Sequence, residues 1–411
     1  MPDLTKIRLY IVKTYGSGSD IIMMYISIDP TKECIMSFTL SNKELSVSTP
    51  SRLCLFGEHL DYLGLEVIAC AIDLRFRAVI TSREDSLIEI FIRDSRIDTL
   101  NMENNASVYE GMVIDLDRPV IYENDRDYLR SAVAVLQRNS VTLSGVTVIM
   151  DSDIPIGKGM SSSSTMIVVL IKALLESVGH EAADDPHKIA YWAYLAEVEE
   201  FGEPGGMMDQ YTSALGGLLN LDFTDGTTTA RKMTVKPSGS FILFDSKEKK
   251  NTTAVLGGAK EPALRALSKI GHGVREILSE NLDIGSYGLD EQAERVISAA
   301  CENYAILLKA KELLTSEDDF DDEIFGRLIY EHHIRLRDGL GISTDKIEHI
   351  LDTAIASGAL GGKINGSGGG GCCFVYVRKE DRTKVLEAVE KIGFPGRILD
   401  IDTGVRVEDN D

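Results

Sequence analysis

The stretch IPIGKGMSSSST at residues 154–165 runs without a break into MIVVLIKALLES at residues 166–177. The second half is apolar at helical spacing, so the pattern predicts a helix that begins among the serines. Gly157 and Gly159 lack a Cβ and would let the backbone approach a ligand closely. A helix start also presents free N–H groups and the positive end of the helix dipole, a combination that binds phosphate. The segment therefore predicts either a phosphate-binding loop or an ordinary turn in which a serine caps the helix.

The residues that this loop would offer to phosphate form one continuous group. They are Gly157, Lys158, Gly159, Met160, Ser161, Ser162, Ser163 and Ser164. The serine hydroxyls can add hydrogen bonds to phosphate, and one of them can reach a magnesium ion. The spacing differs from the G-x-x-x-x-G-K-[ST] loop, because here the lysine lies between the two glycines.

A second polar group follows a predicted strand in PSRLCLFGEHLDYLGLEVI, residues 50–68. Glu58, His59 and Asp61 lie within four residues at the end of that strand, where they can hydrogen-bond several hydroxyls of a small polyol. Arg52, earlier on the strand, can bind phosphate or hold a carboxylate in place. The alternative for this turn is a solvated surface with a salt bridge. Glu, His and Asp could also bind a metal, but the helical H-E-x-x-H spacing that would indicate such a site is absent here.

A glycine-rich run, KINGSGGGGCCFVYV, occupies residues 363–377. Its glycines, at 366 and at 368–371, include Gly366, Gly368, Gly369 and Gly370. Such a run is unsuited to the interior of a helix or strand, whereas the CCFVYV that follows predicts a buried strand. The run is therefore either a loop whose N–H groups line a phosphate or a linker.

A lone carboxylate stands in EFGEPGGMMDQYTSALGG, residues 200–217. Asp209 follows a glycine turn that contains Gly206, and it lies at the start of a predicted helix. An Asp at this position is often a helix N-cap. The functional alternative is a carboxylate beside a substrate hydroxyl, acting as a general base or as an electrostatic partner.

The composition limits the class of protein. The 411 residues suffice for two or three domains, and 44% hydrophobic with 26% charged residues is typical of a globular protein. The net charge of −22 argues against a general surface for nucleic acid or anionic membranes. The six cysteines form no C-x-x-C pair, which favours reduced thiols over a zinc site or a disulfide framework. We expect a cytoplasmic protein that binds neither nucleic acid nor membrane.

The pattern of strands and helices predicts a mixed α+β fold without regular βαβα alternation. Strands are predicted at residues 7–12, 21–28, 35–40, 66–82, 144–155, 227–235, 240–246 and 374–377, and helices at 164–178, 187–201, 263–280, 290–315 and 381–393. After residues 222–230 the pattern changes to two strands followed by long helical segments, which predicts two domains, 1–225 and 226–411.

Taken in order, PSRLCLFGEHLDY, IPIGKGMSSSST and INGSGGGGC resemble the three motifs of the GHMP small-molecule kinases. That superfamily includes galactokinases, homoserine kinases, mevalonate kinases and phosphomevalonate kinases, and GEHLDY and GGMMDQY look most like galactokinases. The resemblance spans roughly residues 50–380 and leaves residues 1–45 unmatched. It implies an N-terminal domain resembling ribosomal protein S5 domain 2 and a ferredoxin-like C-terminal domain, with ATP and the acceptor in the cleft between them.

The resemblance also implies a role for each candidate residue. Residues 157–164 would hold the ATP phosphates, and Gly366, Gly368, Gly369 and Gly370 would support the same end of the cleft. Asp209 would contact the attacking sugar hydroxyl, with Arg52 stabilising developing charge. Glu197 stands twelve residues before Asp209, as the acidic magnesium ligand does in galactokinases, so Glu197 and Ser163 would hold Mg²⁺. Glu58, His59, Asp61 and Gly206 would bind the sugar.

We therefore expect ATP- and magnesium-dependent phosphorylation of a monosaccharide at its anomeric hydroxyl. Three departures from galactokinases stand out: LGL follows GEHLDY where an Asn-Gly-Gly type continuation is usual, the strand reads SRLCLFGEH where GRVNLIGEH is typical, and AVLGGAKEP lacks a tyrosine and paired arginines. Because that tyrosine packs near the sugar in galactokinases, its absence leaves the sugar open. The alternatives are a uronic-acid kinase, another GHMP kinase such as mevalonate kinase, and a non-catalytic sugar sensor. The expected partners are the sugar and ATP, and the oligomeric state is left open.

Overall fold

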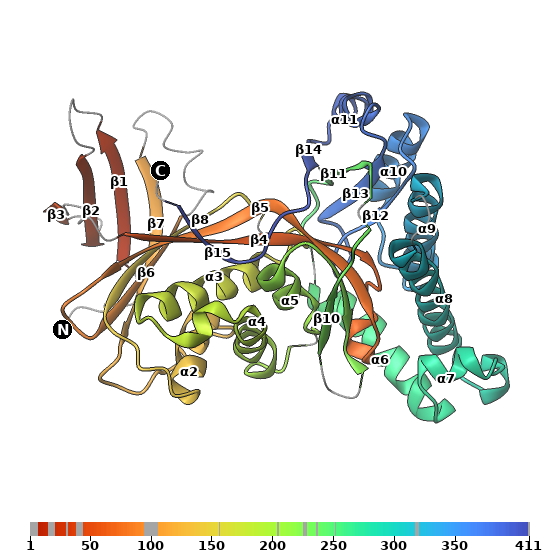
Figure 1. Ribbon diagram of the computed structural model, residues 1–411, viewed down its shortest axis with the longest axis horizontal. Helices are drawn as coiled ribbons and strands as arrows, with labels where there is room; N and C mark the ends of the chain where they lie inside the picture. Colours follow the sequence, from red (N-terminus) through yellow and green to blue (C-terminus); the bar gives the residue numbers. More distant parts are fainter. Residues whose placement is uncertain are drawn as a thin grey trace.

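The computed structural model describes residues 7–14, 21–29, 32–37, 44–93, 106–155, 157–203, 205–224, 228–235, 237–250, 252–316 and 320–409. Two β-sheets organise these residues, a large one formed mainly by the N-terminal half and a four-stranded one in the C-terminal half (Figure 1). The mixed α+β fold class expected from the sequence is confirmed. The boundary between residues 225 and 226 stays a prediction.

The large sheet contains eleven strands among the described residues. Nine of them follow the order β10-β9-β5-β8-β6-β7-β1-β2-β3, while β4 pairs with β5 and with β15. Their bounds are β1 Ile7–Thr14, β2 Ile21–Asp29, β3 Lys32–Ser37, β4 Leu45–Phe56, β5 Val67–Ser82, β6 Leu87–Arg93, β7 Ala106–Asp115, β8 Val146–Ser152, β9 Leu218–Asp222, β10 Thr229–Lys232 and β15 Arg406–Glu408. The predicted strand at 35–40 is observed as far as Ser37, and its last three residues lie outside the described part.

Four helices lie on one side of the β4–β5 pair, two of them packed directly on these strands and the other two packed on those helices (Figure 1). They are α2 Tyr128–Arg138, α3 Ser162–Ser177, α4 Pro186–Tyr194 and α5 Met208–Leu215. Helix α3 is buried along most of its length, because its run of Ile, Val and Leu leaves little polar surface for solvent. This packing fixes the direction of the helix and therefore the position of the serines at its N-terminus.

The second sheet has the order β12-β13-β11-β14 and is antiparallel throughout. The strands are β11 Ser240–Asp245, β12 Gly361–Ile364, β13 Cys372–Val377 and β14 Gly396–Leu399. Side chains of strand β11 alternate between two cores. Phe241 and Leu243 belong to the main core, while Ile242 and Phe244 join a second core with α10 (Asp345–Ala356) and α11 (Arg382–Lys391). Both faces of this sheet are therefore buried.

The helices of the C-terminal half are α6 Thr252–Ile270, α7 Val274–Ser279, α8 Glu291–Thr315, α9 Asp322–Ile334, α10 Asp345–Ala356 and α11 Arg382–Lys391. The single helix predicted at 263–280 is in fact two, α6 and α7, separated at Gly271, whose φ of +78° ends the first helix. The strand predicted at 227–235 is shorter than expected, since only Thr229–Lys232 pair with β9.

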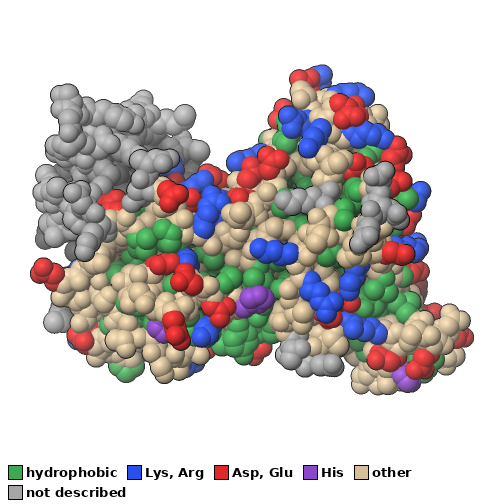
Figure 2. Space-filling model, viewed as in Figure 1, with side chains coloured by type: hydrophobic (Ala, Val, Ile, Leu, Met, Phe, Trp, Pro, Cys, Tyr) green, Lys and Arg blue, Asp and Glu red, His purple; other side chains and the backbone are tan. Residues whose placement is uncertain are grey.

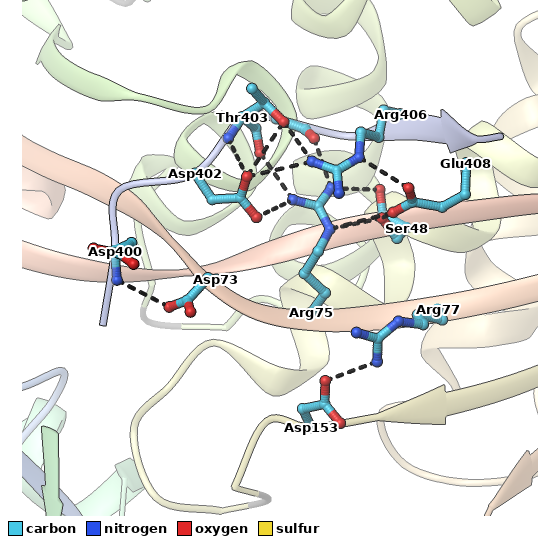
Figure 3. Close-up of polar contacts among 11 residues, drawn as sticks. Ser48, Asp73, Arg75, Arg77, Asp153, Asp400, Asp402, Thr403, Arg406 and Glu408 are labelled. Atoms are coloured by element: carbon cyan, nitrogen blue, oxygen red, sulfur yellow. Dashed lines mark hydrogen bonds and ion pairs between the residues drawn. The ribbon is translucent and has the colours of Figure 1, made fainter. Parts of the chain in front are cut away.

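The chain returns to the large sheet at its C-terminal end, where Arg75 of β5 holds it in place (Figure 3). Its guanidinium donates to the Oγ of Ser48 over 2.6 Å, to the Oδ2 of Asp402 over 2.6 Å and to the carbonyl of Gly404 over 2.8 Å. Strand β15 then pairs with β4. Because β4 also carries Arg52, this contact ties the C-terminal segment to the strand that supports the site described below.

Acidic and basic side chains are interspersed on the face of the molecule in Figure 2, with apolar side chains between them. Across the described residues, no helix has both the length and the apolar character that crossing a membrane requires.

Candidate functional site

A cavity of about 1310 Å³ lies against the helical side of the large sheet. Among the segments that line it are four that are distant in sequence: β4 with the turn after it, the turn at residues 157–164, the start of α5, and residues 366–367. Arg52, Asp209 and Ser161 all line it. Four of the predicted motifs therefore share one cavity.

The turn before α3 has the shape that anion binding needs. Gly157 and Gly159 have φ of +69° and +79°, and Ser161 is also left-handed, at +54°. A Cβ at Gly159 would lie 2.7 Å from the carbonyl oxygen of Asn365, so the position tolerates only glycine. The side chain of Ser161 does not cap the helix, and Ser162 to Ser164 line the cavity. The N-terminus of α3 therefore faces the cavity with N–H groups available to a ligand.

Arg52 and Asp209 form a two-point ion pair across 157 residues of sequence. The Nε of Arg52 donates to Oδ1 of Asp209 over 2.8 Å, and Nη2 donates to Oδ2 over 2.9 Å. The hydroxyl of Ser161 donates to the same Oδ2 over 2.6 Å. Met207 is the N-cap of α5 and Asp209 lies in the first turn, so the alternative that Asp209 caps the helix is wrong. Its carboxylate is instead held beside the turn at residues 157–164.

Lys158 points away from the cavity that its neighbours line. Its ammonium lies 2.9 Å from Oδ1 of Asp245 and donates to the carbonyl of Glu248 over 3.2 Å. Its carbonyl accepts from the N–H of Cys372, so the residue joins the turn to β13. The side chain of Lys158 therefore stabilises the turn, and only its backbone remains a candidate for phosphate binding.

Glu58 forms an ion pair with a buried lysine. Lys363 of β12 is fully buried and donates to Oε2 of Glu58 over 2.5 Å and to the carbonyl of Cys54 over 2.9 Å. Glu58 is itself only 3% exposed and still lines the cavity. A pair this deep is costly to break, because either partner alone would be an uncompensated charge.

His59 is fixed at the same turn. Its Nδ1 lies 3.0 Å from the hydroxyl of Tyr62, and its Nε2 lies 3.0 Å from the carbonyl of Ser367. Burial lowers the pKa of His59 to about 4, so the ring is neutral at physiological pH. Because both ring nitrogens already have partners, His59 forms part of the cavity wall and has no ring nitrogen free for a ligand.

Asp61 lines the same cavity as Asp209. Burial, and then the nearby charge of Asp209, raise the pKa of Asp61 to about 7. A Cβ at Gly206 would come within 2.2 Å of its carboxylate, so the glycine makes room for Asp61. Of the three polar residues at this turn, Asp61 is the one best placed to bind a hydroxyl.

The raised pKa of Asp61 predicts that this residue lowers the free energy of unfolding by an amount that depends on pH. Below about pH 4 its carboxyl is protonated in both folded and unfolded chains, and between pH 4 and pH 7 only the unfolded chain ionises it freely. We expect the stability that Asp61→Asn gains over the wild type to rise from little at pH 4 to about 1–3 kcal/mol at pH 8. Urea unfolding at each pH measures this, with the exposed Asp400→Asn as control. A gain that does not change with pH would contradict the argument.

Only the first part of the glycine run meets the cavity. Gly366 lines it, and a Cβ there would lie 2.8 Å from the carbonyl oxygen of Gly159. Gly368 packs against Ile342, Gly369 donates to the carbonyl of Ile342 over 2.7 Å, and Gly370 lies against Glu248. The later glycines therefore support the turn through close backbone contacts, and their predicted contact with a ligand stays a prediction.

Glu197 lies in a π-helical turn, η3 (Leu195–Glu199), that extends α4 into the cavity wall. Gln210 donates to its Oε2 over 2.6 Å, and Ser163 and Ser164 also hydrogen-bond the carboxylate. Burial raises the pKa of Glu197. Among the described residues no three His, Cys, Asp or Glu side chains gather around one metal position. One carboxylate and a serine next to a phosphate site nevertheless fit Mg²⁺, which takes few protein ligands.

Three residues at the site were not singled out by the sequence patterns. Lys363 and Asn365 flank Ile364 in the letters before the glycine run, and Asn365 donates to the carbonyl of Gly159 over 3.0 Å. Lys250 lines the cavity, although it ends the charged run KEKK and looks like a solvated residue. For Lys363 the sequence does hold one signal: a lysine flanked by glycine and apolar residues, as in GGKIN, indicates that its ammonium group is buried.

Models of known protein families match three parts of the chain. The GHMP kinases N terminal domain matches residues 127–217, and the GHMP kinases C terminal model matches residues 310–395. The galactokinase galactose-binding signature matches residues 38–82, which include Arg52, Glu58 and Asp61.

Individual proteins match over most of the chain. Mevalonate kinase of Thermococcus onnurineus is 27% identical over 376 residues, covering 88% of this chain and 98% of the relative. Galactokinase of Thermotoga neapolitana is 29% identical over 354 residues, covering 84% and 93%. The crystal structure of Lactococcus lactis galactokinase complexed with galactose matches with a TM-score of 0.73 at 18% identity, covering 89% of this chain and 95% of that one.

Proposed function

Since the chain belongs to the GHMP kinase family, whose members are kinases, we propose that it transfers the terminal phosphoryl group of ATP to a hydroxyl of a monosaccharide. One observation carries the proposal: Asp209, held by Arg52 and Ser161, faces the same cavity as the uncapped start of α3. A phosphate tail on that helix start and a hydroxyl on that carboxylate would be neighbours. This is the geometry that phosphoryl transfer needs.

The donor side would work through the backbone. The N–H groups at the start of α3 and the glycine turn at Gly157 and Gly159 would bind the triphosphate, with the helix dipole adding positive potential. The hydroxyl of Ser162 adds a donor, whereas those of Ser163 and Ser164 already hydrogen-bond the carboxylate of Glu197. Because these groups are positioned before the ligand arrives, they stabilise charge without reorganising.

The acceptor side would work through Asp209. Its Oδ1 accepts one hydrogen bond from Arg52, which leaves a lone pair for the attacking hydroxyl, while Oδ2 accepts from both Arg52 and Ser161. Such a carboxylate can orient the hydroxyl toward the phosphorus and receive its proton. Arg52 remains next to the reacting atoms as a fixed positive charge.

The sugar would lie against the turn after β4. The galactose-binding signature covers Glu58, His59 and Asp61, and all three line the cavity. Glu58 already accepts from Lys363, so its free oxygen and the carboxylate of Asp61 would receive the sugar hydroxyls. Gly206 keeps the space beside Asp61 open.

Glu197 and Ser163 would hold Mg²⁺ at the phosphate end of the cavity. When bound, the ion would neutralise charge on the phosphates. Gln210 fixes the carboxylate of Glu197 with its 2.6 Å hydrogen bond, so the position of that ligand is set by the protein.

A second acceptor, mevalonate, is favoured by the relatives named mevalonate kinase, which match 88% of this chain. Mevalonate carries a carboxylate, whereas a neutral monosaccharide offers only hydroxyls. Asp61 favours the neutral ligand, since its charge, present in part at neutral pH, would repel a carboxylate, whereas the charge of Glu58 is balanced by Lys363. A uronic acid combines both kinds of group and remains a variant of the sugar proposal.

A substrate panel tests the proposal. Purified protein with ATP and Mg²⁺ is given neutral sugars, uronic acids and mevalonate, and ADP release is recorded for each, with ³¹P NMR to locate the new phosphate ester. We expect turnover on at least one sugar, with the phosphate on the anomeric carbon. Turnover on mevalonate alone would show that the acceptor is mevalonate and not a monosaccharide. Sugar binding without ADP release on any acceptor would identify a non-catalytic sensor.

A further inference from the structure

Lys250 reaches the cavity from the segment that follows β11. Its ammonium lies between the two glycine turns: a Cβ at Gly159 would come within 2.4 Å of Nζ, and one at Gly366 would come within 2.9 Å. The amine is therefore in contact with the backbone of the turn that precedes α3 and also with the start of the glycine run. Lys250 is a wall residue of the cavity, together with both glycines.

The other cations around this point are already paired. Arg52 is bound to Asp209, Lys363 to Glu58, and Lys158 to Asp245. Lys158 was the lysine expected at the phosphates, but its side chain is on the other side of the turn. Lys250 occupies the cavity side of the same turn.

The surroundings of Lys250 make its position costly for a residue with a purely structural role. Burial lowers the pKa of Lys250 to about 8; the charges of Glu58 and Asp209 act to raise it, and that of Arg52 acts to lower it further. An anion bound next to the ammonium would remove this cost by favouring the charged form. Strongly perturbed groups in a cleft are frequent at functional sites.

We propose that Lys250 binds the terminal phosphoryl group of the nucleoside triphosphate and remains in contact with it during transfer. This assignment rests on the proposed function. In the step, the acceptor oxygen forms the new bond to phosphorus, and its proton passes to the Asp209 carboxylate. The bond from phosphorus to the bridging oxygen breaks, and its electron pair stays on ADP. Lys250 keeps its proton throughout and neutralises charge on the transferred oxygens.

The test compares two nucleotides that differ by the terminal group. Isothermal titration with Mg²⁺ measures the affinity of Lys250→Met for the non-hydrolysable triphosphate AMPPNP and for ADP. We expect the AMPPNP affinity to fall about tenfold or more, as loss of a charge-assisted hydrogen bond implies, and the ADP affinity to change less than about threefold. Lys250→Arg should recover most of the AMPPNP affinity because it keeps the charge.

The matched control is Lys249→Met, which removes the exposed neighbouring lysine and should leave both affinities unchanged. If Lys250→Met is unfolded by circular dichroism, Lys250→Gln takes its place in the same comparison. Equal losses for ADP and AMPPNP, or no loss for either, would overturn the assignment while leaving the proposed function intact. A wild-type protein that binds neither nucleotide would overturn both. A loss seen only in the affinity for an anionic acceptor would move Lys250 from the donor to the acceptor.

Discussion

Asp209→Asn is expected to lower kcat by about a thousandfold or more, while the affinity for AMPPNP changes less than about threefold. The asparagine has nearly the same shape, but its amide nitrogen cannot accept from the Nη2 of Arg52 or from the hydroxyl of Ser161, and the negative charge is gone. The attacking hydroxyl then loses both its acceptor and its orientation. Steady-state ADP release and nucleotide titration measure the two quantities.

The chain offers a closely matched control. Arg337 and Asp338 form an ion pair with the same two-point geometry, 2.7 Å from Nε to Oδ1 and 3.0 Å from Nη2 to Oδ2, but on the exposed surface. Asp338→Asn should therefore leave kcat unchanged. If Asp209→Asn retained turnover near the wild-type level, Asp209 would be removed from the mechanism. An equal loss in both variants would indicate damage to the fold.

Lys363→Met is expected to lower the free energy of unfolding by about 3–5 kcal/mol. The substitution leaves Glu58 buried without its cation, since Lys363 is fully buried and Glu58 is only 3% exposed. Neutralising the stranded carboxylate as well should recover much of the loss, so the double variant Lys363→Met, Glu58→Gln should be more stable than the single one. Urea unfolding of the three proteins gives the comparison.

An exposed lysine serves as the reference for this series. Lys346 is 51% exposed and lies 3.9 Å from Glu248, so Lys346→Met should cost about 1 kcal/mol or less. A double variant as unstable as Lys363→Met alone would show that the lost contacts, and not the stranded charge, account for the effect.

The local features of the phosphate turn could be predicted from sequence because they depend on neighbours in the chain. Two glycines, a run of serines and an apolar helix are enough to place a helix start among residues 157–164, but that no serine side chain caps it is known only from the structure. Helix α3 and strands β5 and β8 follow the predicted periodicity for the same reason. The break at Gly271 between α6 and α7 was missed, since a single glycine inside a helical pattern is often tolerated.

The pairings at the site depend on tertiary contacts that no local pattern encodes. The sequence could name Arg52 and Asp209 as candidates, but their two hydrogen bonds across 157 residues follow from how β4 meets α5. The direction of Lys158 could not be read from a Gly-Lys-Gly pattern, because left-handed glycines on both sides leave the side chain's exit direction open. Lys250 was missed because lysines in a charged run are usually solvated.

The central claim is that donor phosphate and acceptor hydroxyl meet in one cavity beside Asp209. A crystal structure of the wild-type protein with AMPPNP, Mg²⁺ and the acceptor found in the substrate panel tests it most directly. We predict the terminal phosphorus between the Gly159 turn and Asp209, with the acceptor hydroxyl within hydrogen-bonding distance of that carboxylate. Phosphates bound away from the start of α3, or an acceptor bound remote from Asp209, would contradict the account.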